Sequence, residues 1–295
     1  MRRVLIANPG ASRVTEARLN AVAEALEPID VLRTERAGHA IELARGVGAA
    51  TLFVLGGDGT FNEALNGCAD GAVLGFVPGG GTNVLPRALG IPDDPVDAAR
   101  ALAEGVERRI SLGRVNGRRF AFASGVGLDA ELLRRSGRRR GKRRSDAGVV
   151  LEAVRILAER RGRFAPTLEV RGHGEAAFVL VANAEPYTYV GRTAVHVTRG
   201  AAFELGLDFV APRRLGLRDY PSALRYLARG GGNLDLLRGH DVDRIEVACR
   251  EPMALQADGE DLGDVTEAVF EAERAAVTVL APAPAQAPSD TFARG

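Results

Sequence analysis

A carboxylate stands among glycines at the end of an apolar segment. The stretch Thr51–Gly67 reads TLFVLGGDGTFNEALNG and has glycines on both sides of Asp58. Glycines let backbone N–H groups approach an anion, because no Cβ stands in the way. A second such stretch, PGGGTN at Pro78–Asn83, follows the next apolar segment. Glycine turns of this kind are often purely structural, but two in succession predict a phosphate-binding site.

The acid at Asp58 indicates how the phosphate is held. Neither loop is a Walker A motif or a G-x-G-x-x-G fingerprint, and neither contains a lysine. Asp58 would repel a polyphosphate unless a divalent cation lay between them. Mg²⁺ binds one or two carboxylates together with phosphate oxygens. Asp58 therefore predicts a site for nucleotide-bound Mg²⁺.

A helix is expected to follow the first loop. Thr60 and Glu63 have the spacing of a capping box, which predicts that the helix begins at Thr60. Its N-terminus would point partial positive charge at the loop and at a bound phosphate. Thr82 or Asn83 would cap the helix after the second loop in the same way.

Alternating strands and helices must position both loops. Residues 4–7, 29–34, 51–56 and 73–81 have strand patterns, and segments with helical spacing separate them. This alternation predicts a parallel α/β sheet, whose ligands bind at the C-terminal ends of the strands.

The pattern changes after about Leu112. Short β-rich segments with turns between them dominate residues 113–281, interrupted by helical segments at 145–162 and 222–234. This predicts a mainly antiparallel domain, a β-sandwich. The expected division is therefore residues 1–112, residues 113–281 and a disordered Pro/Ala-rich tail at 282–295.

Composition excludes several classes of protein. The chain has 295 residues and 46% apolar residues, enough for two folded domains and too many for a disordered chain. No apolar run reaches the ~18 residues of a membrane span. Cys68 and Cys249 have no metal-ligand or disulfide spacing, so a reducing, cytoplasmic compartment is expected.

Positive charge is concentrated in one run. Arg134–Arg144 reads RRSGRRRGKRR, with eight basic residues and no acid, in a chain whose net charge is +1. Such a run is often a solvated loop. No aromatic interleaving or nucleic-acid motif accompanies it, so nucleic acid is not the expected partner. Near an anionic bilayer each Lys or Arg gains about 1 kcal/mol, so the run predicts peripheral membrane docking.

Four motifs in order resemble one family. NPGAS at residues 8–12, GGDGTFNEALNG, PGGGTNVLPRALGIP and QADGE at residues 256–260 are similar to those of the bacterial diacylglycerol kinase and lipid kinase family. That family includes the catalytic domains of sphingosine and ceramide kinases. The resemblance implies an NAD-kinase-like α/β domain, a C-terminal β-sandwich and an active site in the cleft between them.

The resemblance also implies ATP as the cofactor, with Mg²⁺. The residues that would contact ATP are Asn8, Pro9, Gly10, Ala11, Ser12, Thr34, Gly56, Gly57, Asp58, Gly59, Thr60, Phe61, Asn62, Gly81, Thr82 and Asn83.

Three positions depart from the family's motifs. Ser12 stands at the usual glycine of the first loop, Gly81 at the usual threonine of the second, and Val84 at its usual aspartate. The neighbouring Thr82 is expected to replace the missing hydroxyl.

Two late acids are the candidates for catalysis. Asp-Gly is an ordinary hairpin turn, and acids in turns are commonly just solvated. By the resemblance, however, Asp258 and Glu260 match the family's D-G-E, whose glutamate is the general base. Carboxylates two residues apart face the same way on a strand, so one would hold metal or water while the other accepts the proton. We assign Glu260 as the base, with Asp258 and Asp58 in the metal network.

Two further acids are candidate metal ligands by the same resemblance. Asp129 matches an acid that often follows the domain crossover, although it would also suit a helix N-cap. Glu204 stands at the acid of a structural Mg²⁺ turn, whose glycine is replaced by Leu205.

The expected activity is phosphoryl transfer from ATP to a lipid hydroxyl, with diacylglycerol as the acceptor and phosphatidic acid as the product. Kinases of sphingoid bases, ceramide, other lipid alcohols or NAD remain alternatives. So does a non-catalytic, nucleotide-responsive membrane-binding protein, although the retained acids argue against it. A homodimer is compatible with each of these candidate functions.

Overall fold

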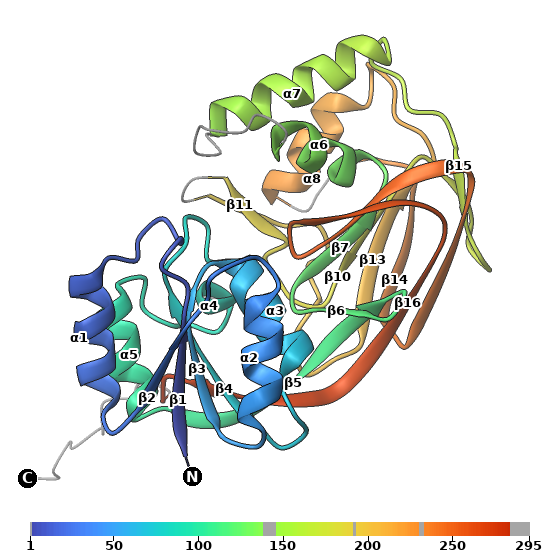
Figure 1. The fold of residues 1–295 in the computed structure, drawn as a ribbon. Helices are drawn as coiled ribbons and strands as arrows, with labels where there is room; N and C mark the ends of the chain where they lie inside the picture. The colour runs from blue at the N-terminus through green and yellow to red at the C-terminus, as the bar shows by residue number, and fades with distance from the viewer. Residues whose placement is uncertain (1, 138–145, 191–192, 230–232, 284–295) are drawn as a thin grey trace, which may run out of the picture.

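The N-terminal domain is a parallel sheet covered by helices on both faces. The computed structural model describes residues 2–137, 146–190, 193–229 and 233–283. The helices α1 and α5 lie against one face of the sheet, and α2 and α3 lie against the other (Figure 1). The sheet has the order β4-β3-β1-β2. Its elements are β1 (Arg3–Ala7), α1 (Glu16–Leu26), β2 (Asp30–Arg33), α2 (His39–Val47), β3 (Thr51–Gly56), α3 (Asp58–Gly67), β4 (Val73–Pro78), α4 (Val84–Ala88) and α5 (Pro95–Ala103).

The central strands are apolar along their whole length because both faces are covered. Leu52, Phe53, Val54 and Leu55 of β3 are all buried, as expected for a parallel strand between two helical layers. Both glycine loops leave this sheet at its C-terminal edge, one after β3 and one after β4.

The C-terminal domain is mainly antiparallel, as predicted, and has its own apolar core around Phe120, Phe209 and Phe270. Its elements are β5 (Val106–Val115), β6 (Arg118–Phe120), β7 (Ala123–Val126), α6 (Leu128–Gly137), α7 (Asp146–Glu159), β8 (Leu168–Val170), β9 (Gly174–Ala176), β10 (Val179–Ala182), β11 (Thr188–Val190), β12 (Thr193–Val195), β13 (Leu207–Pro212), α8 (Tyr220–Arg229), β14 (Leu236–Val242), β15 (Arg244–Ala257) and β16 (Glu260–Ala281).

One long strand connects the two domains. β16 pairs antiparallel with β15 and β5, and its end pairs in parallel with β4 at Thr278 and Val279. Hydrogen bonding is therefore continuous in the order β14-β13-β10-β7-β15-β16-β4-β3-β1-β2. The predicted division at residue 112 falls inside β5.

The strands β15 and β16 are longer than the short β-rich segments that the sequence predicted, and α6 is a helix that it did not predict. The register of the pairs shifts between Ala248 and Met253 and between Glu273 and Val277, and these irregularities interrupt the alternation of apolar residues. The strands nevertheless continue through them. The tail from residue 284 lies outside the described residues, and none of the described helices is both long and apolar enough to cross a membrane.

Candidate active site

The two glycine loops pack directly against each other. The N–H of Gly79 donates to the carbonyl of Gly56 at 2.6 Å. A Cβ added to Gly80 would lie 2.7 Å from the Cα of Gly57. The glycines are therefore required for the contact between the loops, as well as for access of an anion to the backbone.

The helix after the first loop begins earlier than predicted. α3 starts at Asp58 with Gly57 as its N-cap, and no side chain caps it. The predicted capping box is wrong because Glu63 bonds elsewhere. Its carboxylate accepts from the N–H groups of Gly38 and Ala40 at 2.9 and 3.1 Å, at the start of α2.

The first loop forms one side of a cavity of about 670 Å³. We call this the loop cavity. The segments that follow β1, β2, β3 and β4 line it. Within this lining, the side chain of Asn8 donates to the hydroxyl of Thr60 at 2.9 Å. Its lining includes eight of the residues predicted to contact ATP: Asn8, Pro9, Gly10, Ala11, Thr34, Gly57, Gly59 and Thr60.

The other predicted ATP contacts lie elsewhere. Phe61, Asn62 and Asn83 are buried, and Gly81 and Thr82 line a different cavity. Asn83 supports the second loop, since its side chain bonds to both the N–H and the carbonyl of Gly80. It is the N-cap of α4 with φ +49°, without a side-chain cap bond.

Asp58 connects the first loop to the second. Its Oδ1 accepts from the N–H of Leu85 at 3.3 Å, in the first turn of α4. The pKa of Asp58 is raised to about 7, chiefly because the carboxylate is removed from water; nearby Asp258 also raises it, and the N–H groups at the start of α4 lower it. A cation beside Asp58 would remove this cost of ionisation.

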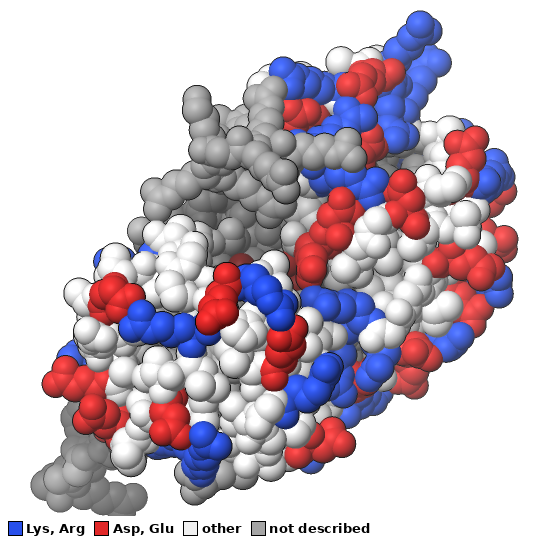
Figure 2. Space-filling model, viewed as in Figure 1, with Lys and Arg blue, Asp and Glu red and all other residues white. Residues whose placement is uncertain are grey.

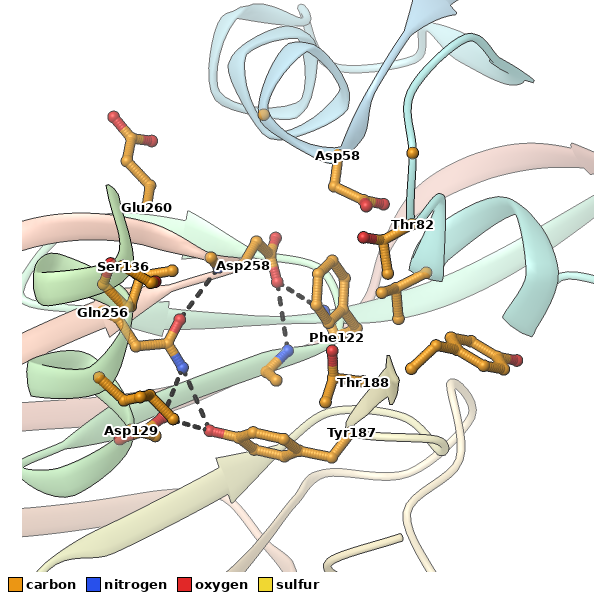
Figure 3. A pocket seen from close by; sticks show the side chains of 18 of the residues that line it. Asp58, Thr82, Phe122, Asp129, Ser136, Tyr187, Thr188, Gln256, Asp258 and Glu260 are labelled. Carbon is orange, nitrogen blue, oxygen red and sulfur yellow. Dashed lines mark hydrogen bonds between the residues drawn. The ribbon is translucent and has the colours of Figure 1, made fainter. Parts of the chain in front are cut away.

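A second cavity of about 600 Å³ lies between the two domains. We call this the interdomain cavity (Figure 3). Its walls are largely apolar or aromatic, and acids stand where the domains meet. The side chains of Val84, Phe122, Leu132, Leu133, Tyr187 and Tyr189 form the apolar part, and the acids are Asp58, Glu63, Asp129, Asp258 and Glu260. Gly59 and Glu63 line this cavity and the loop cavity alike, so the two adjoin at the start of α3.

Asp258 is buried where three elements meet. Its Oδ1 accepts from the N–H groups of Phe122 and Ala123, and its Oδ2 accepts from the N–H of Ala121 and from the side chain of Asn62, all within 3.2 Å. Burial raises the pKa of Asp258 although these bonds oppose it. The four donors use both oxygens, so a metal ion at Asp258 would have to share an oxygen with an existing bond.

Asp258 and Glu260 do not face the same way, contrary to the strand-based expectation. Asp258 and Gly259 form the turn between β15 and β16, with φ of +48° and +78°, so the alternation of a strand does not apply. Glu260 begins β16 and is 48% exposed, and it extends away from Asp258 in Figure 3. Its Oε2 accepts from Arg118 at 2.7 Å, a contact that no sequence motif indicated.

Asp129 is held on the opposite wall of the interdomain cavity. Its Oδ2 accepts from the hydroxyl of Tyr187 at 2.6 Å and from the side chain of Gln256 at 2.8 Å. Burial raises the pKa of Asp129. Glu204 is exposed, pairs with Arg108 and lines neither cavity, and among the described residues it belongs to no group of three metal-ligating side chains.

The donor set suits a metal that arrives with a nucleotide. No three metal-ligating side chains converge within the described ranges. Asp58 and Asp258 approach from separate domains, and Mg²⁺ needs only one or two carboxylates when phosphate oxygens complete its shell. The residues therefore fit a nucleotide-bound ion better than a cage built by the protein alone.

Comparison with known proteins assigns the N-terminal domain. Residues 2–115 match the family model of the diacylglycerol kinase catalytic domain. These residues are a diacylglycerol kinase catalytic domain. The diacylglycerol kinase of Bacillus subtilis is 45% identical over 85 residues, 28% of each chain. The "probable lipid kinase YegS-like" of Pseudomonas aeruginosa is 34% identical over 139 residues, 45% of this chain and 46% of that protein.

Nearly the whole chain shares its fold with a solved structure that is also described as a diacylglycerol kinase. A diacylglycerol kinase structure from Bacillus anthracis str. Sterne superposes over 95% of this chain and 96% of that one, with a TM-score of 0.69 and 20% identity. The curated relatives match over less than half of their own length. The sequence matches thus concern the diacylglycerol kinase catalytic domain, and the structural match extends the fold to the β domain.

We predict that Gly80→Ala destabilises the protein. The new Cβ would meet the Gly57 backbone at 2.7 Å, and backbone cannot rotate away as a side chain can. The expected cost is about 1–3 kcal/mol, or several degrees in Tm, measured by calorimetry. Gly81→Ala is the matched control, because no atom of the described residues lies within 4 Å of its added Cβ. Equal Tm values for both variants would contradict the close packing of the loops.

We also predict that the effect of Asp58→Asn on stability depends on pH. The pKa of Asp58 is about 7 in the folded protein and about 4 in the unfolded chain. The wild type therefore loses stability as the pH rises from about 4 to 7, whereas the variant does not. The Tm of Asp58→Asn minus that of the wild type should be more positive at pH 8.5 than at pH 5, without nucleotide. Asp70→Asn, at an exposed position, serves as the control. A difference that is the same at both pH values would show that Asp58 is not desolvated.

Proposed function

We propose that the protein is an ATP-dependent lipid kinase. The observation that carries this proposal is the meeting of two cavities at Gly59, at the N-terminus of α3. One cavity is enclosed by glycine loops, and the other has apolar walls between the domains. A phosphate at this helix end would be accessible from both cavities.

ATP would occupy the loop cavity with its γ-phosphate toward α3. Backbone N–H groups and the positive end of the helix dipole favour an anion there. Asp58, with Asp258 behind it, would hold the Mg²⁺ that accompanies ATP. When bound, this ion would offset the charge of the phosphate groups.

The lipid hydroxyl would enter from the interdomain cavity. Its oxygen attacks the γ-phosphorus, the bond from that phosphorus to the bridging oxygen breaks, and ADP leaves. The hydroxyl proton passes to the carboxylate of Glu260, which lines this cavity. Glu260 is thus the proposed general base, and the buried Asp258 fixes the turn that presents it.

The apolar walls favour an acceptor with acyl chains, and diacylglycerol is the acceptor to test first. The direct experiment is transfer of radiolabelled phosphate from ATP to a total lipid extract, with NAD and sphingosine offered separately. Mass spectrometry of the product identifies the acceptor. Labelled phosphatidic acid supports the proposal, labelled NADP would make the protein an NAD kinase, and ATP binding without any transfer would favour the non-catalytic alternative.

We predict that Glu260→Gln lowers kcat by about 10²–10⁴-fold, the usual contribution of a general base. ATP affinity, measured by calorimetry, should persist because Glu260 does not line the loop cavity. Glu271→Gln is a close control, since Glu271 is also on β16, also 48% exposed and also paired with an arginine. A kcat near the wild-type value in Glu260→Gln would place the base elsewhere.

We further propose that the protein docks on anionic membranes through the end that carries α6, α7 and α8. The predicted docking run Arg134–Arg144 begins within α6, where Arg134 pairs with Asp261 and Asp264, and Arg135 pairs with Glu131 and Glu159. These two arginines are therefore engaged within the protein. The other six basic residues lie outside the described residues, and the docking proposal depends on them.

Exposed apolar side chains lie at the same end of the molecule. Five of the seven exposed large apolar residues in the described ranges are on α7 or in the segment leading into and along α8: Leu151, Val154, Leu217, Leu224 and Leu227. The hydroxyl of Tyr220, at the start of α8, donates a hydrogen bond to the carbonyl of Gly162, just after α7, and so connects the two helices. Figure 1 shows the three helices together at one end, and basic side chains gather there in Figure 2. Leucines among arginines suit the boundary between headgroups and acyl chains.

We predict that a Leu217→Ser/Leu224→Ser variant, and a variant with Gln at the six basic residues of 138–144, both bind anionic vesicles more weakly. Activity on vesicles should fall while activity on a short-chain, water-soluble acceptor is spared. Binding should also weaken with salt, since the Debye length is ~8 Å at physiological ionic strength. Co-sedimentation and paired kinetic assays measure this.

The control variant carries Ser at the exposed residues Val31 and Val106, which lie on the N-terminal domain and β5. Equal losses on both acceptors would assign these residues to catalysis or folding. Unchanged vesicle binding together with a loss of dimers would make the apolar face a contact between two copies of the chain.

A further inference from the structure

Arg118 stands between the proposed base and the helix of the first glycine loop. One nitrogen, Nη2, donates to Oε2 of Glu260 at 2.7 Å and to Oδ1 of Asn62 at 2.8 Å. Glu260 belongs to the β domain, and Asn62 lies one turn after Asp58 on α3. A single guanidinium therefore contacts both domains.

Local sequence fixes the place of Arg118. Asn116 and Gly117 form a two-residue turn with φ of +45° and +88°, and Val115 pairs with Arg118 across it. Asn-Gly favours this type of hairpin turn, which sets the register of the strands that it joins. Arg118 is consequently held at the first position of β6.

Asn62 connects Arg118 to the rest of the domain junction. Its side-chain nitrogen donates to Asp258 and to the carbonyl of Arg119, both at 2.9 Å. Asn66, one turn further along α3, accepts from the N–H of Arg119 at 3.0 Å. α3 is thus attached to β6 at two successive turns, and Arg118 extends that attachment to Glu260.

The environment makes this pairing stronger than an ordinary surface contact. The Arg118 side chain is 25% exposed, and its Nε is buried without a hydrogen-bond partner among the described residues. A guanidinium that is partly removed from water loses hydrogen bonds to solvent, so each remaining hydrogen bond to a protein acceptor contributes more to its stability. Glu260 itself is half exposed and would otherwise sample several rotamers.

We infer that Arg118 is a positioning residue that holds the Glu260 carboxylate at the interdomain cavity and fixes its place relative to α3. The inference rests on the proposed kinase activity, because it gives Arg118 a role only through the proposed base. Arg118 lines neither cavity, so it would touch neither ATP nor the acceptor.

The adjacent residue provides a matched control. Arg119 is also on β6, has a 23% exposed side chain and pairs with a glutamate, but that partner is Glu273, which lines neither cavity. Arg119→Met therefore removes an equally buried charge from the same strand without affecting Glu260.

The experiment compares steady-state kinetics of Arg118→Met, Arg118→Lys and Arg119→Met, with and without Glu260→Gln. Arg118→Met should lower kcat by up to about 100-fold, the cost of a misplaced catalytic group, with little change in KM for ATP. Arg118→Lys, which keeps the charge, should recover much of kcat. Arg118→Met should cause no further loss when Glu260 is already Gln, because residues that act as a unit are not additive.

An unchanged kcat in Arg118→Met would overturn the inference, and so would an equal loss when Glu260 is already Gln. A comparable loss in Arg119→Met would also overturn it, by indicating a general effect on the β6 strand. A wild-type protein that transfers no phosphate to any acceptor would instead overturn the proposed function, and the role of Arg118 with it.

Discussion

The arrangement of the site depends on the buried carboxylate of Asp258. It accepts four N–H donors, three from the backbone of residues 121–123 and one from Asn62 on α3. The three backbone bonds hold the β15–β16 turn to the β6–β7 segment of the same domain, and the bond from Asn62 joins it to the N-terminal domain. Removing one partner of a buried, hydrogen-bonded charge is costly, so the relative position of the domains is strongly specified at this point. With the domains held in this position, the loop cavity and the interdomain cavity adjoin at Gly59.

The glycine loops meet two physical demands at once. Their backbones must expose N–H groups to an anion, and they must approach each other closely enough for Gly57 and Gly80 to touch. Asp58 lies at the end of the first loop, where its carboxylate accepts from the N–H of Leu85 on α4 and lies near Asp258 of the other domain. Because burial and Asp258 raise the pKa of Asp58 to about 7, a cation beside it would stabilise its ionised form. This accounts for an acid within a loop that otherwise suits anions.

Sequence patterns predicted what depends on local periodicity. The alternation of apolar strands and helices gave the parallel sheet, and β3 was predicted with its observed bounds, Thr51–Gly56. Other predictions were wrong because long-range hydrogen bonds or the geometry of a turn decide the structure there. Glu63 has the spacing of a capping box, yet it accepts from the start of α2. Asp258 and Glu260 have the spacing of strand neighbours, yet a turn with positive φ separates their directions. Arg118 could not have been chosen from the adjacent arginines of NGRRF, because only the tertiary structure distinguishes its partners from those of Arg119.

A structure of the protein with Mg²⁺ and a non-hydrolysable ATP analogue tests the central claim most directly. The account predicts triphosphate along Gly57–Thr60, with the γ-phosphate at Gly59 and open to the interdomain cavity, and the metal ion at Asp58. A nucleotide whose base occupies the interdomain cavity, or whose γ-phosphate lies away from the start of α3, would contradict it.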